Sequence, residues 1–261
     1  MARSDYLFQP IGFQPTRALS KVPEVTALFW VIKVLTTGMG ETTSDYLAHT
    51  IDPHIAVILG FIGFVAAIAL QFLTKHYVAW VYWLAVVMVS VFGTMAADVL
   101  HVGLGIPYAV SSTFFAISLA VVFALWLFTE GTLAIHSVHT PRREAFYWAT
   151  VLTTFALGTA AGDLTATTVG FGYLGSGYLF AAVIVVPAIA YWLFRLPEIP
   201  AFWFAYIVTR PLGASFADWM GVSKLRGGLD WGTGPVSLAL ALLIAMLVGY
   251  LALSKSDLES E

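Results

Sequence analysis

The residues best placed to do chemistry are four aspartates that recur with one fixed spacing. Each lies fifteen residues after a tryptophan and five after a glycine, and an aromatic residue precedes each tryptophan. Carboxylates bind cations and exchange protons, and an ionisable residue within an apolar segment is by default a functional candidate. The four sets are Trp30, Gly40 and Asp45; Trp83, Gly93 and Asp98; Trp148, Gly158 and Asp163; and Trp203, Gly213 and Asp218.

On a helix, each aspartate shares one face with other polar positions. At about 100° per residue, the positions four and eight before the aspartate lie within about 80° of it, and the tryptophan lies within about 60°. Such polar stripes cannot face lipid cheaply, so we expect them to face one another or a water-filled cavity. The positions eight and four before the aspartates hold Thr37 and Glu41, Ser90 and Thr94, Phe155 and Thr159, and Arg210 and Ala214.

The four stripes differ in charge. At the positions four and eight before the aspartates, Glu41 is the one glutamate and Arg210 the one arginine. Lys33 lies in the same apolar run as Glu41. We expect Glu41 and Arg210 to pair, and Arg210 and Lys33 to act as counter-ions, because a buried charge needs a partner. The pair could take part in proton coupling, or it could only clamp helices together. The sequence leaves both interpretations open.

Three histidines follow the aspartates, namely His49, His54 and His101. Their spacing is not that of a zinc site, so solvated loop residues are the favoured interpretation. Carboxylates with histidines would nevertheless suit a divalent cation, and the three histidines remain candidate ligands of an unidentified metal. No cofactor is expected, because the chain has no cysteine, no nucleotide-binding loop and no nucleophile elbow.

Apolar runs must position these residues. Of the 261 residues, 59% are hydrophobic and 10% are charged, whereas a soluble domain carries roughly 25% charged residues. A membrane-spanning helix needs about 20 predominantly apolar residues. The sequence therefore predicts an all-α integral membrane protein with eight transmembrane helices, at Val25–Leu47, Ile55–Leu73, Val78–Leu100, Tyr108–Phe128, Phe146–Leu164, Tyr178–Phe194, Phe202–Trp219 and Val236–Leu253.

The spans form four two-helix repeats, at about 25–75, 78–130, 144–195 and 199–253, within one membrane domain at 25–253. Two spans per repeat make all four repeats parallel. Residues 1–24 and 254–261 are predicted to be cytoplasmic, because eight basic residues lie on the side of the termini and two on the other. The tryptophans would then form an aromatic belt at the cytoplasmic interface, with the aspartates toward the outer ends.

The segments Phe29–Asp45 and Arg210–Asp218 resemble a family of bacterial membrane proteins built from four tandem two-helix repeats, each marked by a tryptophan. The function of that family is unknown. The resemblance covers residues from about 25 to 253 and implies a multi-pass protein of the bacterial inner membrane. It implies no activity, so function has to be inferred from the residues.

We expect a secondary transporter or ion-conducting protein that moves a cation, with a divalent metal as one candidate, coupled to protons. Asp45, Asp98, Asp163, Asp218 and Glu41 would bind the ion. A membrane scaffold or assembly protein is the alternative, with the stripes only joining helices. An enzyme using paired carboxylates is less favoured, since no catalytic signature is present. The expected partners are the lipid bilayer and a small cation or proton, with a homo-oligomer left open. A net charge of −3 argues against nucleic acid.

Overall fold

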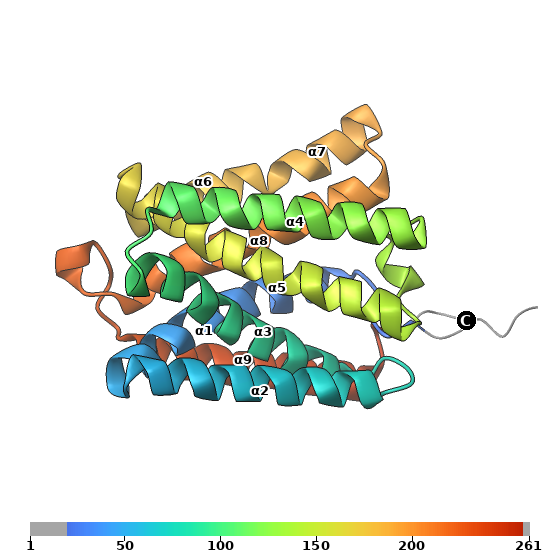
Figure 1. Ribbon diagram of the computed structural model, residues 1–261, viewed down its shortest axis with the longest axis horizontal. Coiled ribbons are helices and arrows are strands. Elements are labelled where there is room, and N and C mark those ends of the chain that lie inside the picture. Colours follow the sequence, from blue (N-terminus) through green and yellow to red (C-terminus); the bar gives the residue numbers. More distant parts are fainter. Residues whose placement is uncertain (1–19, 258–261) are drawn as a thin grey trace, which may run out of the picture.

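The computed structural model describes residues 20–257, and within that range the chain is helical and has no strands. The predicted N-terminal segment lies outside the described residues up to position 19. Long helices run side by side along the molecule (Figure 1). They are α1 (Ala27–Thr50), α2 (Pro53–Leu73), α3 (Ala79–Asp98), α4 (Tyr108–Glu130), α5 (Pro141–Asp163), α6 (Gly172–Val183), α7 (Val185–Phe194), α8 (Glu198–Gly221) and α9 (Thr233–Ser254).

Short helical turns connect or extend these helices. Two are π-helical, η1 (Val99–Gly103) and η3 (Leu164–Thr168), and they continue α3 and α5 directly after Asp98 and Asp163. Two are 3₁₀ turns, η2 (Ile135–Ser137) and η4 (Lys224–Arg226). The sixth predicted span is divided into α6 and α7, which meet at Ile184. Pro187 explains the break, because proline lacks an N–H and crowds the carbonyl four residues before it.

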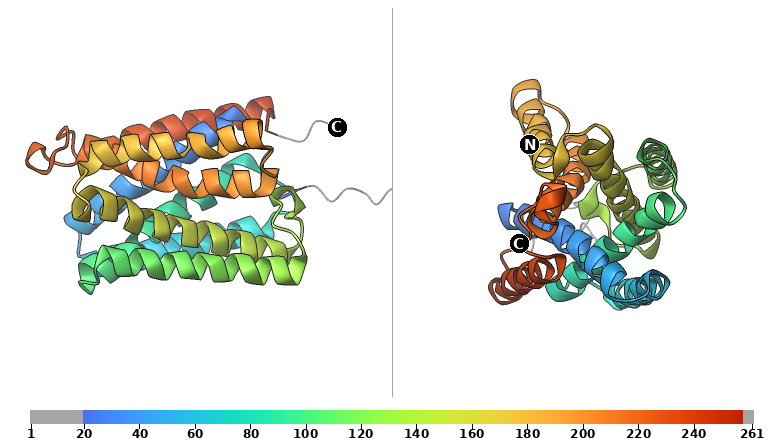
Figure 2. Two further views of the ribbon diagram at one scale, coloured as in Figure 1. Left: turned by 90° about the horizontal axis from the view of Figure 1, so that it is seen from above. Right: turned by 90° about the vertical axis from the view of Figure 1, so that its left-hand side faces the viewer.

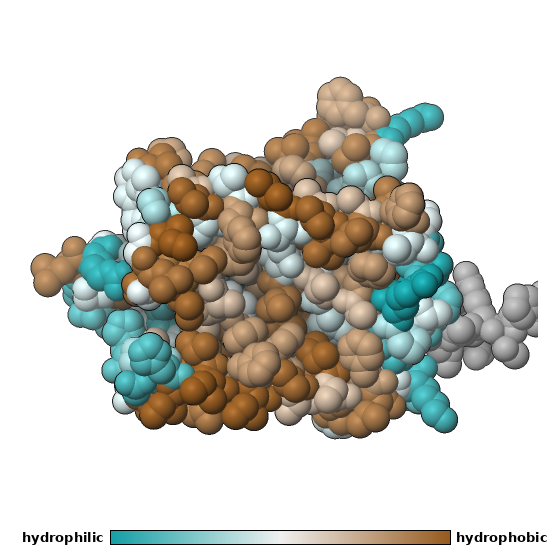
Figure 3. Space-filling model, in the orientation of Figure 1, coloured by the Kyte–Doolittle hydropathy of each residue, from teal (hydrophilic) through white to brown (hydrophobic). Residues whose placement is uncertain are grey.

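Five helical stretches are long and apolar enough to cross a membrane: α2, α3 with η1, α4, α6 with α7, and α9. The other three long helices, α1, α5 and α8, each carry more charged residues than α3, and these lower their hydropathy. On the face drawn in Figure 3, hydrophobic residues cover the middle and hydrophilic residues gather at both ends. Ile58 and Ile62 of α2 and Leu242 and Met246 of α9 are each more than half exposed. Exposed apolar surface of this extent is unfavourable in water, and it indicates a multi-pass membrane protein.

The inner helices α1, α3, α5 and α8 form a closed ring, in which each packs on the next and α8 packs back on α1. The end-on view in Figure 2 shows the remaining helices around them. The helix α2 packs chiefly on α3, α4 on α5, α6 on α8, and α9 on α1. The outer helix of each repeat therefore packs on the inner helix of the next repeat, and the fourth repeat closes on the first. The polar stripes are thereby turned away from the outer surface, as predicted.

The motif glycines allow the inner helices to approach one another closely. A Cβ atom on any of them would overlap the neighbouring helix. The neighbouring residue is in every case the one that lies eight positions before the aspartate of the next repeat. The pairs are Gly40 with Ser90, Gly93 with Phe155, Gly158 with Arg210, and Gly213 with Thr37.

The aromatic–tryptophan pairs also form a cyclic set at the end of the bundle opposite the aspartates, here called the tryptophan end. Three of the tryptophans, Trp83, Trp148 and Trp203, are at most 4% exposed. The predicted aromatic belt is therefore wrong for these three, because each packs inward on the aromatic residue of the preceding repeat. The centroid distances are 5.6 Å for Phe29–Trp83, 5.6 Å for Tyr82–Trp148, 6.2 Å for Tyr147–Trp203 and 5.6 Å for Phe202–Trp30.

Candidate functional site

The guanidinium of Arg210 lies within the inner ring and is fully buried. Its Nη2 has three acceptors for its two N–H groups, which are Glu41 Oε2 at 2.5 Å, the Thr159 hydroxyl at 2.6 Å and the Thr94 hydroxyl. Its Nη1 donates to the Thr37 carbonyl oxygen at 3.1 Å. The predicted pairing of Glu41 with Arg210 is thus present. These five residues, here called the axial cluster, come from all four repeats.

The threonines of the axial cluster are held by their own helices. The Thr94 hydroxyl donates to the Ser90 carbonyl at 3.0 Å, and the Thr159 hydroxyl donates to the Phe155 carbonyl at 3.2 Å. A hydroxyl has one proton and two lone pairs, so each oxygen remains an acceptor for Arg210. The Ser90 hydroxyl is used differently, since it donates to the Thr36 carbonyl of α1 at 2.9 Å. Ser90 therefore joins two inner helices and does not contact the guanidinium.

Lys33 is buried beside the axial cluster, but it contacts no carboxylate of the described residues. Its Nζ lies 3.9 Å from the ring centroid of Phe155 and 4.1 Å from that of Tyr206. Among residues 20–257 the ammonium has no hydrogen-bond partner. The predicted counter-ion role is therefore not a direct ion pair, and the aromatic faces supply the electrostatic contact that the ammonium has.

At the other end of the bundle, here called the aspartate end, Asp98 and Asp163 converge on His101. The His101 Nε2 lies 2.9 Å from Asp98 Oδ1 and 3.4 Å from Asp163 Oδ2. The imidazole is 1% exposed and packs on the ring of Tyr108, with the centroids 4.7 Å apart. The interpretation of His101 as a solvated loop residue is wrong, because η1 continues the helix and turns the ring inward.

The other predicted ligands lie apart from this group. His49 and His54 are exposed; the His49 Nδ1 lies 2.6 Å from the Asp45 carbonyl, and His54 lies in the first turn of α2. Asp218 is buried and Asp45 is partly exposed. Within the described residues neither of these two carboxylates makes a side-chain hydrogen bond or ion pair. Both are within electrostatic range of the other acids: the charges of Asp45 and Asp163 act on Asp218, and those of Glu41 and Asp98 act on Asp45.

A second buried ionic group, at the tryptophan end, was not predicted from the sequence. The Lys21 ammonium lies 2.5 Å from Glu144 Oε2, and the Gln71 amide donates to Glu144 Oε1 at 3.1 Å. Lys21 is one of the eight basic residues counted on the side of the termini, and it is buried. Glu144 lies in the first turn of α5 directly after Arg142 and Arg143, so no spacing in the sequence indicated that its partner would be Lys21.

The tail at the C-terminal end is tied down at the same place. The Tyr77 hydroxyl donates to the carboxylate of Asp257, and the Glu24 N–H donates to the Asp257 carbonyl at 3.1 Å. Burial, and then the hydrogen bond to Asp257, raise the pKa of Tyr77, so that its hydroxyl stays protonated and remains a donor. Residues 20–26 and 255–257 thus lie against the bundle and close its tryptophan end.

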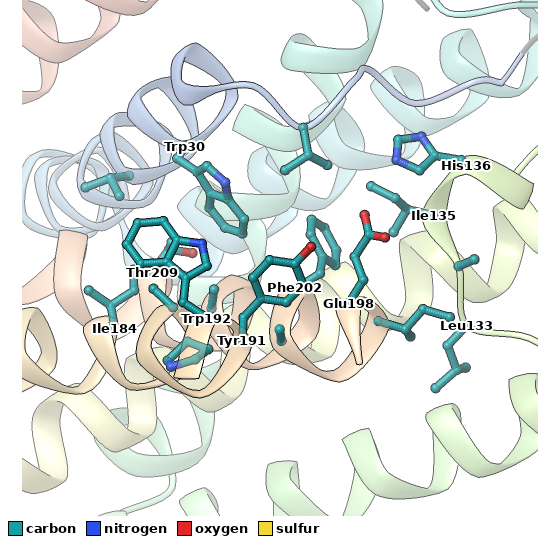
Figure 4. Close-up of a pocket in the computed structure, with 18 residues that line it drawn as sticks. Trp30, Leu133, Ile135, His136, Ile184, Tyr191, Trp192, Glu198, Phe202 and Thr209 are labelled. Carbon is teal, nitrogen blue, oxygen red and sulfur yellow. The ribbon is translucent and has the colours of Figure 1, made fainter. Parts of the chain in front are cut away.

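A cavity of about 610 Å³ lies on the side of the bundle, between α1, α7, α8 and the connection that follows α4. Figure 4 shows Trp30, Tyr191, Trp192 and Phe202 around it, with Glu198 and His136 toward one end. None of the four predicted aspartates lines this cavity. It is mainly apolar, and it is separate from both the axial cluster and the His101 group.

Comparison with known proteins gives one match. A family described as a Repeat of Unknown Function (DUF347) matches the chain four times, at residues 28–77, 81–132, 146–196 and 201–257. These matches follow the four repeats of the fold. No curated protein and no solved structure is similar to the chain.

Proposed function

The chain belongs to the DUF347 repeat family, and on that premise we propose that it is a secondary transporter or ion-conducting protein that moves a cation in exchange with protons. The observation that carries the proposal is the axial cluster, where one buried guanidinium holds groups from every repeat. Four carboxylates lie at the aspartate end of the same helices. Carboxylates at one end of the bundle are suited to attract a positive ion, and the guanidinium of Arg210 in its middle is suited to control the passage of that ion.

The proposal includes a topology. All eight helical rods cross the membrane, with α1, α5 and α8 crossing inside a ring of more apolar helices. Both termini and the tryptophan end face the cytoplasm of a bacterium, and the aspartate end faces outward. This orientation places most basic residues inside. The crossing of the membrane is supported by the exposed apolar surface, most of which lies on α2, α4, α7 and α9.

The mechanism follows from the charges. Nearby carboxylates repel one another, and a bound cation relieves that repulsion. Below them, the ion pair of Arg210 and Glu41 closes the axis. A proton taken up by Glu41 removes the countercharge of Arg210, which keeps only its neutral acceptors on Thr37, Thr94 and Thr159. The guanidinium is then no longer held by an ion pair to α1 and can move off the axis, so that proton uptake and cation passage are linked.

The scaffold alternative also has an observation in its favour. The hydrogen bonds of Arg210 reach all three other inner helices, so the axial cluster could hold the repeats together and do nothing else. The two functions differ in what happens when the pair is changed. A scaffold needs the cluster only for stability, whereas a transporter needs the acid of Glu41 for coupling.

Purified protein in liposomes that contain a pH-sensitive dye tests the proposal. Gradients of Na⁺, K⁺, Mg²⁺, Mn²⁺ and Zn²⁺ are imposed in turn, and proton movement is recorded. We expect at least one cation to drive proton movement through the wild type, and Glu41→Gln to reduce that movement at least tenfold. The exposed acid Glu198 provides the control, and Glu198→Gln should retain wild-type rates. Absence of coupled movement with every ion would favour the scaffold, and full activity of Glu41→Gln would refute the coupling role of Glu41.

A further inference from the structure

The group of Asp98, His101 and Asp163 has the composition and geometry of a metal site, and it belongs to two repeats only. One ligand atom from each side chain lies within 4.8 Å of the other two. The distances from His101 Nε2 to the carboxylate oxygens, 2.9 and 3.4 Å, are close to the roughly 3.3 Å that separates two ligands of a tetrahedral zinc ion. A metal could therefore be held with little rearrangement.

The position of the imidazole suits a metal ligand. His101 is buried, and its Nδ1 has no hydrogen-bond partner among the described residues. In the metal-free protein the two carboxylates accept from Nε2 when that nitrogen carries the proton. A metal would take the place of that proton, because the neutral ring can carry its proton on Nδ1 instead and present the lone pair of Nε2 between the two carboxylates.

The exposure of the three side chains indicates an exchangeable site. The His101 side chain is 1% exposed, whereas those of Asp98 and Asp163 are 28% and 20% exposed. The site is thus closed on the protein side and open on the other. Three protein ligands leave a coordination position for water, as in sites that exchange ligands, whereas structural zinc sites are filled by four.

The sequence allows one such site per chain. The positions equivalent to His101, three after the aspartate, hold Ala48, Ala166 and Gly221 in the other repeats. The site is also connected to the axial cluster. Thr94, which accepts a hydrogen bond from Arg210, lies one turn from Asp98 on α3.

We propose that Asp98, His101 and Asp163 form the outward-facing binding site for the transported ion, and that this ion is a divalent first-row transition metal such as Mn²⁺ or Zn²⁺. The inference rests on the proposed transport function and names its substrate class. An imidazole together with carboxylates favours these metals, whereas Na⁺, K⁺, Mg²⁺ and Ca²⁺ prefer oxygen ligands alone.

Metal binding to the full chain in detergent tests the site independently of transport. Co²⁺ is the optical probe, followed by its visible absorption, and Zn²⁺ and Mn²⁺ are added as competitors. The wild type should bind one equivalent of Co²⁺, and a large excess of Mg²⁺ or Na⁺ should not displace it. His101→Ala, Asp98→Asn and Asp163→Asn should each weaken binding at least tenfold. His76→Ala and Glu198→Gln, at exposed residues outside this group, are the controls and should bind within twofold of the wild type.

Thermal unfolding in the absence of metal identifies variants that fail to fold, and His101→Gln serves as a second, more conservative test of the same nitrogen. Equal Co²⁺ binding by the wild type and by every folded variant of the three ligands would overturn the site, as would displacement by Mg²⁺. The liposome assay separates the two proposals. Coupled movement of a cation that survives His101→Ala would sustain transport and refute this site. One-equivalent Co²⁺ binding without coupled movement of any ion would sustain the site and refute transport.

Discussion

The buried pair of Glu41 and Arg210 allows a quantitative test of how the bundle is held together. Glu41→Gln keeps an acceptor oxygen at the same place but removes the charge that balances the guanidinium. A hydrogen bond to a charged group contributes about 1.5–3 kcal/mol, and removal of one partner of a buried pair costs about 3–5 kcal/mol. Arg210 keeps three neutral acceptors, on Thr37, Thr94 and Thr159. We therefore expect a loss at the lower end of that range, about 3 kcal/mol in the free energy of unfolding.

The double variant separates charge imbalance from lost packing. Arg210→Gln alone leaves Glu41 buried without a countercharge and should also cost about 3 kcal/mol. With both residues changed, no charge remains uncompensated. The double variant should therefore be about as stable as either single variant, which corresponds to a coupling energy of about 3 kcal/mol.

Equilibrium unfolding in mixed detergent micelles, followed by tryptophan fluorescence, measures these free energies. The tryptophans pack between repeats at the tryptophan end, so their emission reports separation of the inner helices. Glu198→Gln, at an exposed acid, should change stability by no more than about 0.5 kcal/mol. Additive losses in the double variant, with a coupling energy under about 0.5 kcal/mol, would show that the two charges do not stabilise each other and would refute the reasoning.

Two further predictions concern packing and orientation. Gly158→Ala should destabilise the protein by about 1–3 kcal/mol, since the added methyl overlaps Arg210. Gly249→Ala in α9, where nothing lies within 4 Å, should be neutral or stabilise the protein by up to about 1 kcal/mol. The same unfolding assay measures both, and equal stability of the two variants would contradict the close approach of α5 and α8. Reporter fusions at residue 140 and at the C-terminus should register the cytoplasm and a fusion at residue 227 the outside, and an external C-terminus would overturn the proposed orientation.

The repeat could be recognised from the sequence because its marks are local. The spacing of tryptophan, glycine and aspartate identifies four units, and the helical period places Glu41 and Arg210 on inward faces. Their pairing then follows, because each is the one residue of its charge at the positions four and eight before the aspartates. The closed order of the inner helices follows from four parallel units of equal construction.

Other features depend on contacts between distant parts of the chain. Lys21 meets Glu144 across 123 positions, and Tyr77 meets Asp257 across 180. No helical period relates such residues. The inward turn of His101 depends on the π-helical η1, whose backbone shift has no sequence signature of the kind that spacing detects. For the same reason the sequence predicted an equivalent place for all four aspartates, and it could not show that Asp98 and Asp163 alone converge on His101.

The closed ring has a consequence for symmetry. Four separate copies of one two-helix unit could assemble into the same ring, but every copy would then place an identical residue at each equivalent position. Four arginines or four glutamates would meet on the axis, and their mutual repulsion would open it. A single covalent chain removes that restriction, because each quarter can mutate by itself. The one arginine, one glutamate and two threonines around the axis are an arrangement that only such a fused tetramer can have, and the histidine beside Asp98 breaks the symmetry in the same way.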